Sequence, residues 1–183
     1  MSTIETPRLI LRPWTEDDAF DLLPVFSNPE AMKHWNTPPW QGVDEVRSNI
    51  RRSLSTSADS HAAWSVVSKE TDKPVGFVNY HHREPRNHRL EIGYIIGSWL
   101  WRTGLMSEAV RGLIAHCFQN LNTYRIEATV SPDNAASLAF LERLDFTLEG
   151  GPMRARMWTS DGRKLDALML AILEPDWRRK SLV

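Results

Sequence analysis

The pattern of apolar residues changes abruptly near position 100, and this change limits the possible folds more than any other feature. From Leu90 to Gly97, side chains alternate between two faces, which is typical of a β-strand. From Leu105 to Leu121, apolar residues recur at helical spacing. A short connection containing Gly104 separates the two patterns. The sequence therefore predicts a strand that turns directly into an amphipathic helix.

The rest of the chain predicts strands and helices in mixed order. Expected strands cover residues 7–13, 61–69, 74–82, 124–130, 146–158 and 165–173, and expected helices cover 15–27, 44–54 and 134–144, with another starting at Glu30. This order is typical of a mixed α/β sheet of the α+β kind. No repeat or linker divides the 183 residues, so we expect one domain, 1–183.

Charge and hydropathy exclude several classes of protein. The net charge is −1 without a basic stripe, which argues against a nucleic-acid partner. No apolar run approaches the ~18 residues that cross a membrane, and the first residues lack a signal-peptide pattern. The single cysteine, Cys117, cannot form an intrachain disulfide. We therefore expect a cytoplasmic protein.

The strand-to-helix connection has the properties of an anion site. Backbone N–H groups at a helix N-terminus are unpaired, and the helix dipole favours negative charge there. Gly104 permits close approach of a ligand, and Arg102 offers a guanidinium to phosphate oxygens. An ordinary strand–helix connection has the same features, so the connection alone does not predict a phosphate ligand.

Five segments in the same order resemble the GNAT acetyltransferases, in particular the branch of ribosomal-protein-alanine N-acetyltransferases. They are TPRLILRPWTEDDA near the start, NPEAMKHW, EIGYIIG, WRTGLMSEA, and NAASLAFLERLDFTLEG. WRTGLMSEA resembles the pyrophosphate turn of that branch, W-G-x-G-x-M-T-E-A. Two residues depart from the pattern. Arg102 stands where the family prefers Gly, and Asp145, which we expect in a left-handed conformation, stands where it prefers Gly before Phe.

The resemblance implies a GNAT fold, a mostly antiparallel sheet that splays between its fourth and fifth strands and is flanked by helices. Acetyl-CoA lies in that split in the family, with no metal. Its pantetheine arm would pair with residues 94–97, chiefly Ile95 and Ile96, and its pyrophosphate would lie on the turn amides. The implied cofactor contacts are Tyr94, Ile95, Ile96, Gly97, Trp101, Arg102, Thr103, Gly104, Leu105, Met106, Ser107, Asn134, Ser137 and Phe140.

Transfer of an acetyl group to an amine needs a base for the amine and a proton for the departing thiolate. Glu91, on the fourth strand, is the candidate base, although a strand-face carboxylate in a structural pair would look the same. Ser137 falls on the motif serine and is the candidate donor to the thiolate, although it could also bond only backbone. From the resemblance, a backbone N–H near Ile95 would stabilise the oxyanion.

The acceptor side is less defined by sequence. Trp35 and Trp40 bracket a loop that borders the substrate entrance in the family, and they could equally pack in the core. Tyr80 is a third candidate for acceptor contact. His81 and His82 are adjacent, so an extended backbone would point them to opposite faces, and we expect neither to bind metal. The basic end, WRRK, reads as a solvated tail.

Three functions remain open at this stage. The first is acetylation of a protein N-terminal α-amine, of the ribosomal-protein type, and the second is acetylation of a small-molecule amine. The third is a CoA-binding sensor without turnover. Residues 30–60 balance acidic with basic side chains, which gives no support to a cationic acceptor. The resemblance also implies a homodimer, because members of the family often form dimers.

Overall fold

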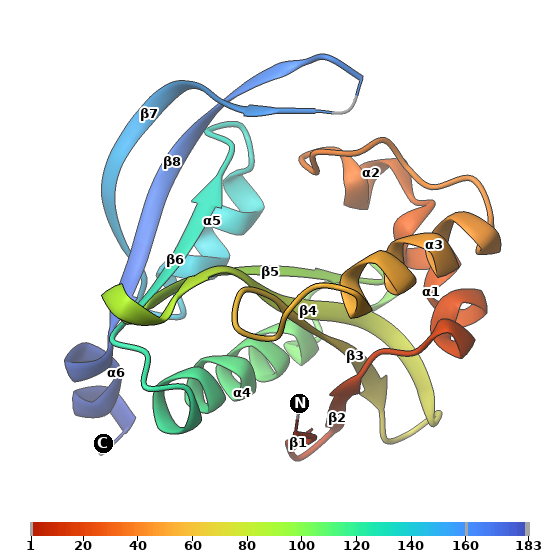
Figure 1. Ribbon diagram of the computed structural model, residues 1–183, viewed down its shortest axis with the longest axis horizontal. Coiled ribbons are helices and arrows are strands. Elements are labelled where there is room, and N and C mark those ends of the chain that lie inside the picture. The colour runs from red at the N-terminus through yellow and green to blue at the C-terminus, as the bar shows by residue number, and fades with distance from the viewer. Residues whose placement is uncertain (1, 160, 182–183) are drawn as a thin grey trace.

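A computed structural model describes residues 2–159 and 161–181, and its centre is an eight-stranded mixed sheet (Figure 1). The strand order is β1-β2-β3-β4-β5-β6-β8-β7. The strands are β1 (Ile4–Glu5), β2 (Leu9–Pro13), β3 (Ala62–Ser68), β4 (Lys73–Glu84), β5 (Arg89–Ile96), β6 (Arg125–Val130), β7 (Thr147–Trp158) and β8 (Lys164–Leu173). The helices are α1 (Ala19–Phe26), α2 (Pro29–Met32), α3 (Val43–Leu54), α4 (Leu105–Asn120), α5 (Ala135–Glu142) and α6 (Glu174–Ser181).

The sheet consists of two antiparallel parts joined by one parallel pair. β5 and β6 are the parallel neighbours, and their register covers only Arg89–Glu91 against Arg125–Glu127. Beyond Glu91, β5 continues beside β4 to Ile96, whereas β6 continues beside β8 to Val130. The two strands therefore diverge, and within residues 2–159 and 161–181 no strand lies beside one edge of β5 from Ile92 onward. The expected GNAT fold is confirmed, with β5 and β6 as the family's fourth and fifth strands.

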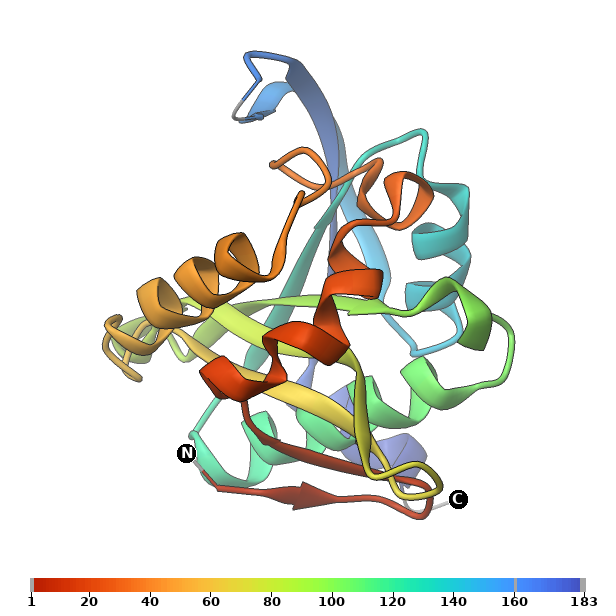
Figure 2. The ribbon, with the colours of Figure 1, turned by 90° about the vertical axis from the view of Figure 1, so that its right-hand side faces the viewer.

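Helices cover the two faces of the sheet with separate apolar clusters. On one face, α4 buries Val110, Leu113 and Ile114 against the strands, together with Leu141 of α5. On the other face, α1 and α3 bury Leu22, Val25, Phe26, Val46 and Ile50 against Phe77 and Ile95. Figure 2 shows α4 and α3 on opposite sides of the strands. The alternation along β5 decides which cluster each of its side chains joins.

The structure differs from the sequence prediction mainly near the chain ends. β1 is an additional short strand, and α2 contains only four residues. The WRRK segment is not a solvated tail but belongs to α6, whose Trp177 packs against Phe118 of α4 at a ring separation of 5.3 Å. Trp177 is the one apolar side chain of the WRRK segment, and a single apolar residue shows no helical periodicity, so the sequence did not predict this helix. Among the described helices, none is long and apolar enough to cross a membrane.

Candidate active site

The unpaired edge of β5 presents alternate backbone groups to the opening between β5 and β6. Gly97 donates its backbone N–H to the carbonyl of Val75, at 2.9 Å, on the β4 side. Because groups on alternate residues of a strand point the same way, Ile95 also faces β4, and its carbonyl lies close to Gly76. Tyr94 and Ile96 face the opening instead. A backbone N–H at Ile95 is therefore not available as an oxyanion donor, and the expectation moves to its two neighbours.

The connection after β5 contains two left-handed residues and leads into α4. Arg102 has φ of +66° and Gly104 has φ of +82°. The first value explains why the family pattern has Gly where this chain has Arg102. The helical ladder begins with Glu108 N–H to Gly104 carbonyl at 3.1 Å, so the amides of residues 104–107 precede it. Trp101, Arg102, Thr103 and Gly104 are exposed, as a turn that binds a ligand requires.

Glu108 holds this turn to the beginning of β2. Its carboxylate accepts hydrogen bonds from the Thr6 hydroxyl at 2.6 Å and from the backbone and side chain of Arg8, both at 2.7 Å. Arg8 also donates to the carbonyl of Thr103 at 3.2 Å. Burial alone would raise the pKa of Glu108, but these hydrogen bonds lower it below its usual value. The turn is therefore fixed from its outer side by a charged residue that does not face the opening.

On the α4 face, Tyr94 and Ser137 form a hydroxyl pair at the opening. Ser137 lies in the first turn of α5, where the Asn134 side chain accepts its backbone N–H at 3.1 Å. The Ser137 hydroxyl is 2.7 Å from the Tyr94 hydroxyl, and the Tyr94 ring packs on Phe140 at 4.8 Å. The structure thus brings four expected cofactor contacts together, from β5 and from α5.

Burial raises the pKa of Tyr94 above its ordinary value, so its hydroxyl stays protonated and can donate. The sequence predicted Tyr94 as a cofactor contact and Ser137 as the proton donor, but it did not predict that their hydroxyls form a pair. The two residues are 43 positions apart, and only the parallel pairing of β5 with β6 brings them together. The alternation of β5 places Tyr94 on the same face as Leu90 and Ile92, and this pattern could have predicted that Tyr94 lies on the α4 face.

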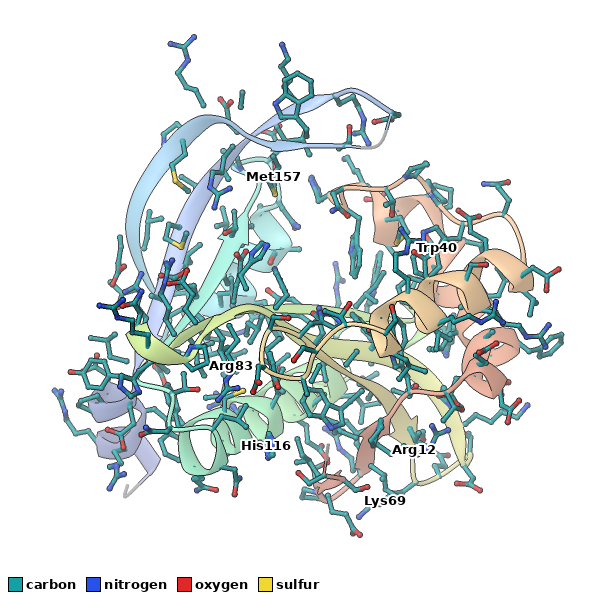
Figure 3. All side chains as sticks on the ribbon, viewed as in Figure 1. Arg12, Trp40, Lys69, Arg83, His116 and Met157 are labelled. Atoms are coloured by element: carbon teal, nitrogen blue, oxygen red, sulfur yellow. The ribbon has the colours of Figure 1, made fainter. Side chains whose placement is uncertain are left out.

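On the opposite face, a pocket of about 440 Å³ lies between the sheet and the α2–α3 region. It is lined by Trp35, Asn36, Thr37, Trp40, Asn49, Arg52, Ser53, Thr56, Ser60, His61, His81 and His82. Trp40 is only 6 % exposed and stacks on Phe26 at 4.2 Å, so most of this ring belongs to the core beneath α1–α3 (Figure 3). Trp35 is half-buried and presents more of its ring to the pocket.

Tyr80 does not line this pocket, contrary to expectation. Its side chain lies on the α4 face, 3 % exposed, in the cluster that contains Trp64. Its hydroxyl donates to the carbonyl of Ala58 at 2.6 Å. Successive side chains of β4 point to opposite faces of the sheet, so Tyr80 points away from the pocket that its neighbour His81 lines. Tyr80 is a core residue with a satisfied hydroxyl.

Glu91 points to the pocket side and contacts two histidines. His82 Nδ1 is 3.3 Å from Glu91 Oε2, and His81 Nε2 is 3.7 Å from Oε1. The backbone at His82 is left-handed, with φ of +48°, so the extended geometry that would point His81 and His82 to opposite faces is not present. The ligand-type atoms of these three residues lie within 4.8 Å of one another, so the expectation of no metal stays a prediction.

Electrostatics make Glu91 a stable anion. Its side chain is 12 % exposed, and this burial alone would raise its pKa. Interaction with His81, then with the Thr129 side chain, and to a smaller extent with His82, lowers the pKa of Glu91 to about 2. A carboxylate this acidic holds a proton poorly at neutral pH, which weakens the expectation that Glu91 itself is the base.

The sheet that splays beside β5, the turn that leads into the N-terminus of α4 and the hydroxyl pair at the opening fit a transferase of the acyl-CoA-dependent class. The chain belongs to the GNAT acetyltransferase family, because residues 8–147 match the model described as Acetyltransferase (GNAT) domain. It is an acetyl-CoA-dependent N-acetyltransferase.

Relatives match this chain over all or part of its length. The uncharacterized N-acetyltransferase p20 of Bacillus licheniformis is 35 % identical over 97 % of this chain and 99 % of its own. The ribosomal-protein-serine acetyltransferase of Escherichia coli is 27 % identical over 60 % of this chain and 61 % of its own. The structure of a spermidine N-acetyltransferase from Vibrio cholerae with CoA and spermine has a TM-score of 0.79 at 18 % identity, covering 94 % of this chain and 99 % of that one.

Proposed function

We propose that this enzyme acetylates a primary amine held in the pocket beside Glu91, and that its acceptor is the α-amine of a protein N-terminus. The observation that carries the choice of acceptor is the charge of the pocket. Among the described residues that line it, Arg52 and three histidines are basic and none is acidic. A polyamine needs carboxylates around its several positive charges, and this pocket offers only Glu91, which His81 and His82 contact.

Two further points favour a peptide. An α-amine has a pKa of ~8 against ~10.4 for a lysine, so a larger share is neutral and reactive near pH 7. The pocket is open and walled by Trp35, which suits a chain end that enters from solvent. The relative from Escherichia coli is a ribosomal-protein-serine acetyltransferase, and the proposal extends that acceptor class to this chain.

Acetyl-CoA would bind along the free edge of β5 in this proposal. The residues fit that ligand, because the backbone groups of Tyr94 and the N–H of Ile96 face the opening, whereas the Ile96 carbonyl accepts from the Trp101 indole N–H at 3.3 Å. Beyond Gly97, the pyrophosphate would lie on the turn amides from Arg102 to Ser107, with the Arg102 guanidinium beside it. Asn134, Ser137 and Phe140 would form the opposite wall.

The proposed reaction is direct attack of the neutral amine on the thioester carbonyl. The nitrogen–carbon bond forms, and the negative charge on oxygen is stabilised by a backbone N–H of Tyr94 or Ile96. The carbon–sulfur bond then breaks, and the thiolate takes a proton from the Tyr94–Ser137 hydroxyl pair, which solvent protonates again. The amine and this proton donor would lie on opposite faces of β5, because Glu91 and Tyr94 point to opposite sides of the strand.

The experiment that tests the function measures release of the CoA thiol with several acceptors. Peptides with free N-termini are compared with the same peptides blocked at the N-terminus, with spermidine and with lysine. We expect turnover only with the free α-amine peptides. Turnover with spermidine but with no peptide would overturn the choice of acceptor. Before this assay, acetyl-CoA at ~100 times its dissociation constant should raise the stability by ~2.7 kcal/mol, which a thermal shift detects.

The hydroxyl pair has its own test in the same assay. Tyr94→Phe removes the buried hydroxyl and keeps the ring on Phe140, and Ser137→Ala removes its partner. We expect each change to lower kcat by about 10²-fold or more with little change in acetyl-CoA affinity. If both variants keep full turnover, the pair does not protonate the thiolate.

A further inference from the structure

The backbone of β4 departs from regular strand geometry at His82 and so brings a second histidine to Glu91. His82 has φ of +48°, and the register with β5 shifts between His81 and Glu84. In a regular strand, His82 would point to the face opposite His81. A left-handed backbone costs a non-glycine residue about 1–2 kcal/mol, and such strain is concentrated at functional sites.

We propose that His82 is the general base of the acetyl transfer and that Glu91 is its positioning residue. This inference rests on the proposed function, since it concerns the proton of the acceptor amine. Glu91 Oε2 lies 3.3 Å from His82 Nδ1, so a Nδ1–H donates to the carboxylate. Nε2 then carries the lone pair. The His82 side chain lines the pocket and is 74 % exposed, so an amine can reach it.

The other candidates in this region are less suited to accept the proton. Glu91 is mostly buried, and its pKa of about 2 makes it a weak base. His61 Nε2 is 2.6 Å from the Ser53 hydroxyl, so that ring is already hydrogen-bonded. His81 Nδ1 is buried, with no hydrogen-bond partner in residues 2–159 and 161–181, and its Nε2 faces Glu91. Of these four groups, only His82 combines a carboxylate partner with an exposed ring nitrogen.

The charged groups around His82 come from several elements. Glu91 faces it from β5, His81 and Glu84 lie on β4, and Arg52 on α3 and His61 line the same pocket. Glu84 is held by Arg89 and Asn87, which leaves Glu91 as the carboxylate that contacts the ring. Glu91 therefore keeps the proton on Nδ1 and stabilises the imidazolium that forms at Nε2.

The step balances in protons and electrons. The amine lone pair forms the new bond to the carbonyl carbon, and one N–H proton passes to His82 Nε2. The electron pair of the broken carbon–sulfur bond stays on sulfur, which takes one proton from the hydroxyl pair. His82 returns its proton to solvent, so the products are the amide and the CoA thiol.

The decisive variant is His82→Gly, assayed with a chelator present to exclude effects of metal at these residues. Glycine tolerates the left-handed backbone, so the variant should fold with an equal or higher Tm. We expect kcat to fall by about 10²–10⁴-fold, with unchanged acetyl-CoA binding, and added imidazole to restore part of the rate. His88→Gly is the matched control, because His88 is also left-handed (φ +51°) but contacts Asn122 away from the pocket.

The positioning role of Glu91 has a readout that does not need an acceptor. Nitrogen NMR of the intact enzyme should show His82 with its proton on Nδ1, and Glu91→Gln should reduce that tautomer and lower kcat. A proton on Nε2 of His82 in the wild-type enzyme overturns the proposal, whether or not an acceptor is known. Full turnover by His82→Gly, or lost turnover that imidazole does not restore, overturns it too. Failure of wild-type enzyme with every amine would instead count against the proposed function.

Discussion

Replacing Arg102 by Gly should make the enzyme more stable and weaken its binding of CoA. Arg102 has φ of +66°, a conformation that costs a non-glycine residue about 1–2 kcal/mol. Glycine removes this cost but has about 0.5–1 kcal/mol more conformational freedom to lose on folding. Subtracting the second range from the first gives a net stabilisation of about 0–1.5 kcal/mol. For a chain of this length that corresponds to a rise in Tm of roughly 0–6 °C.

The same substitution removes a guanidinium from the proposed pyrophosphate site. Hydrogen bonds to charged groups contribute about 1.5–3 kcal/mol, and Arg102 is exposed, so we take the lower value. This corresponds to about a tenfold rise in the Kd of CoA. Calorimetry should show that rise for CoA and no change for an acetylated pantetheine that lacks the pyrophosphate.

Ala155→Gly is the matched control for this experiment. Ala155 lies in β7 with φ of +50° and has only a methyl group to lose. It should gain stability like Arg102→Gly and leave CoA affinity unchanged. A lower Tm for Arg102→Gly would refute the strain argument, and an unchanged Kd for CoA would refute the placement of the pyrophosphate.

Two other substitutions test separate parts of the structure. Tyr80→Phe should destabilise the fold by about 1–2 kcal/mol in denaturant unfolding, because the Ala58 carbonyl loses its donor, and should leave the KM for the acceptor unchanged. A changed KM would return Tyr80 to the acceptor site. Glu108→Gln should destabilise by about 2 kcal/mol at neutral pH. Because the folded pKa of Glu108 is lowered, its contribution is present above the unfolded pKa of ~4.3 and is lost as the pH falls through the folded value. The Tm difference from wild type should therefore shrink below about pH 4, and a constant difference would contradict this account.

The strands and helices that determine the fold could be predicted from the sequence, because each is long and periodic. The alternation over Leu90–Gly97 and the helical spacing after Gly104 correspond to β5 and α4 within one residue. Asp145 has φ of +68°, as expected for a residue in place of the motif glycine. α6 could not be predicted in this way, since a single apolar side chain, Trp177, fixes it to α4.

The site was harder to predict, because it depends on which way single residues point. The motif residues Asn134, Ser137 and Phe140 lie together, as a local sequence signature allows. The contact of Tyr94 with Ser137 joins residues that are distant in sequence. The contact of His82 with Glu91 depends on an irregularity in β4 that the sequence does not show. Tyr80, a candidate for acceptor contact, lies in the core on the α4 face, and the face on which a single strand residue lies depends on register.

The short pairing of β5 with β6 has a consequence for how the protein unfolds. Three residues of register hold the β6–β8–β7 part of the sheet to the β1–β5 part, so the main-chain link between them is weak. Without ligand, the two parts should exchange their amide hydrogens as separate cooperative units, with β6 and β8 opening at lower free energy than β3 and β4. A ligand that occupies the edge of β5 would contact both units and make them unfold as one. Acetyl-CoA would then act as a structural strand of the native sheet as well as the acetyl donor.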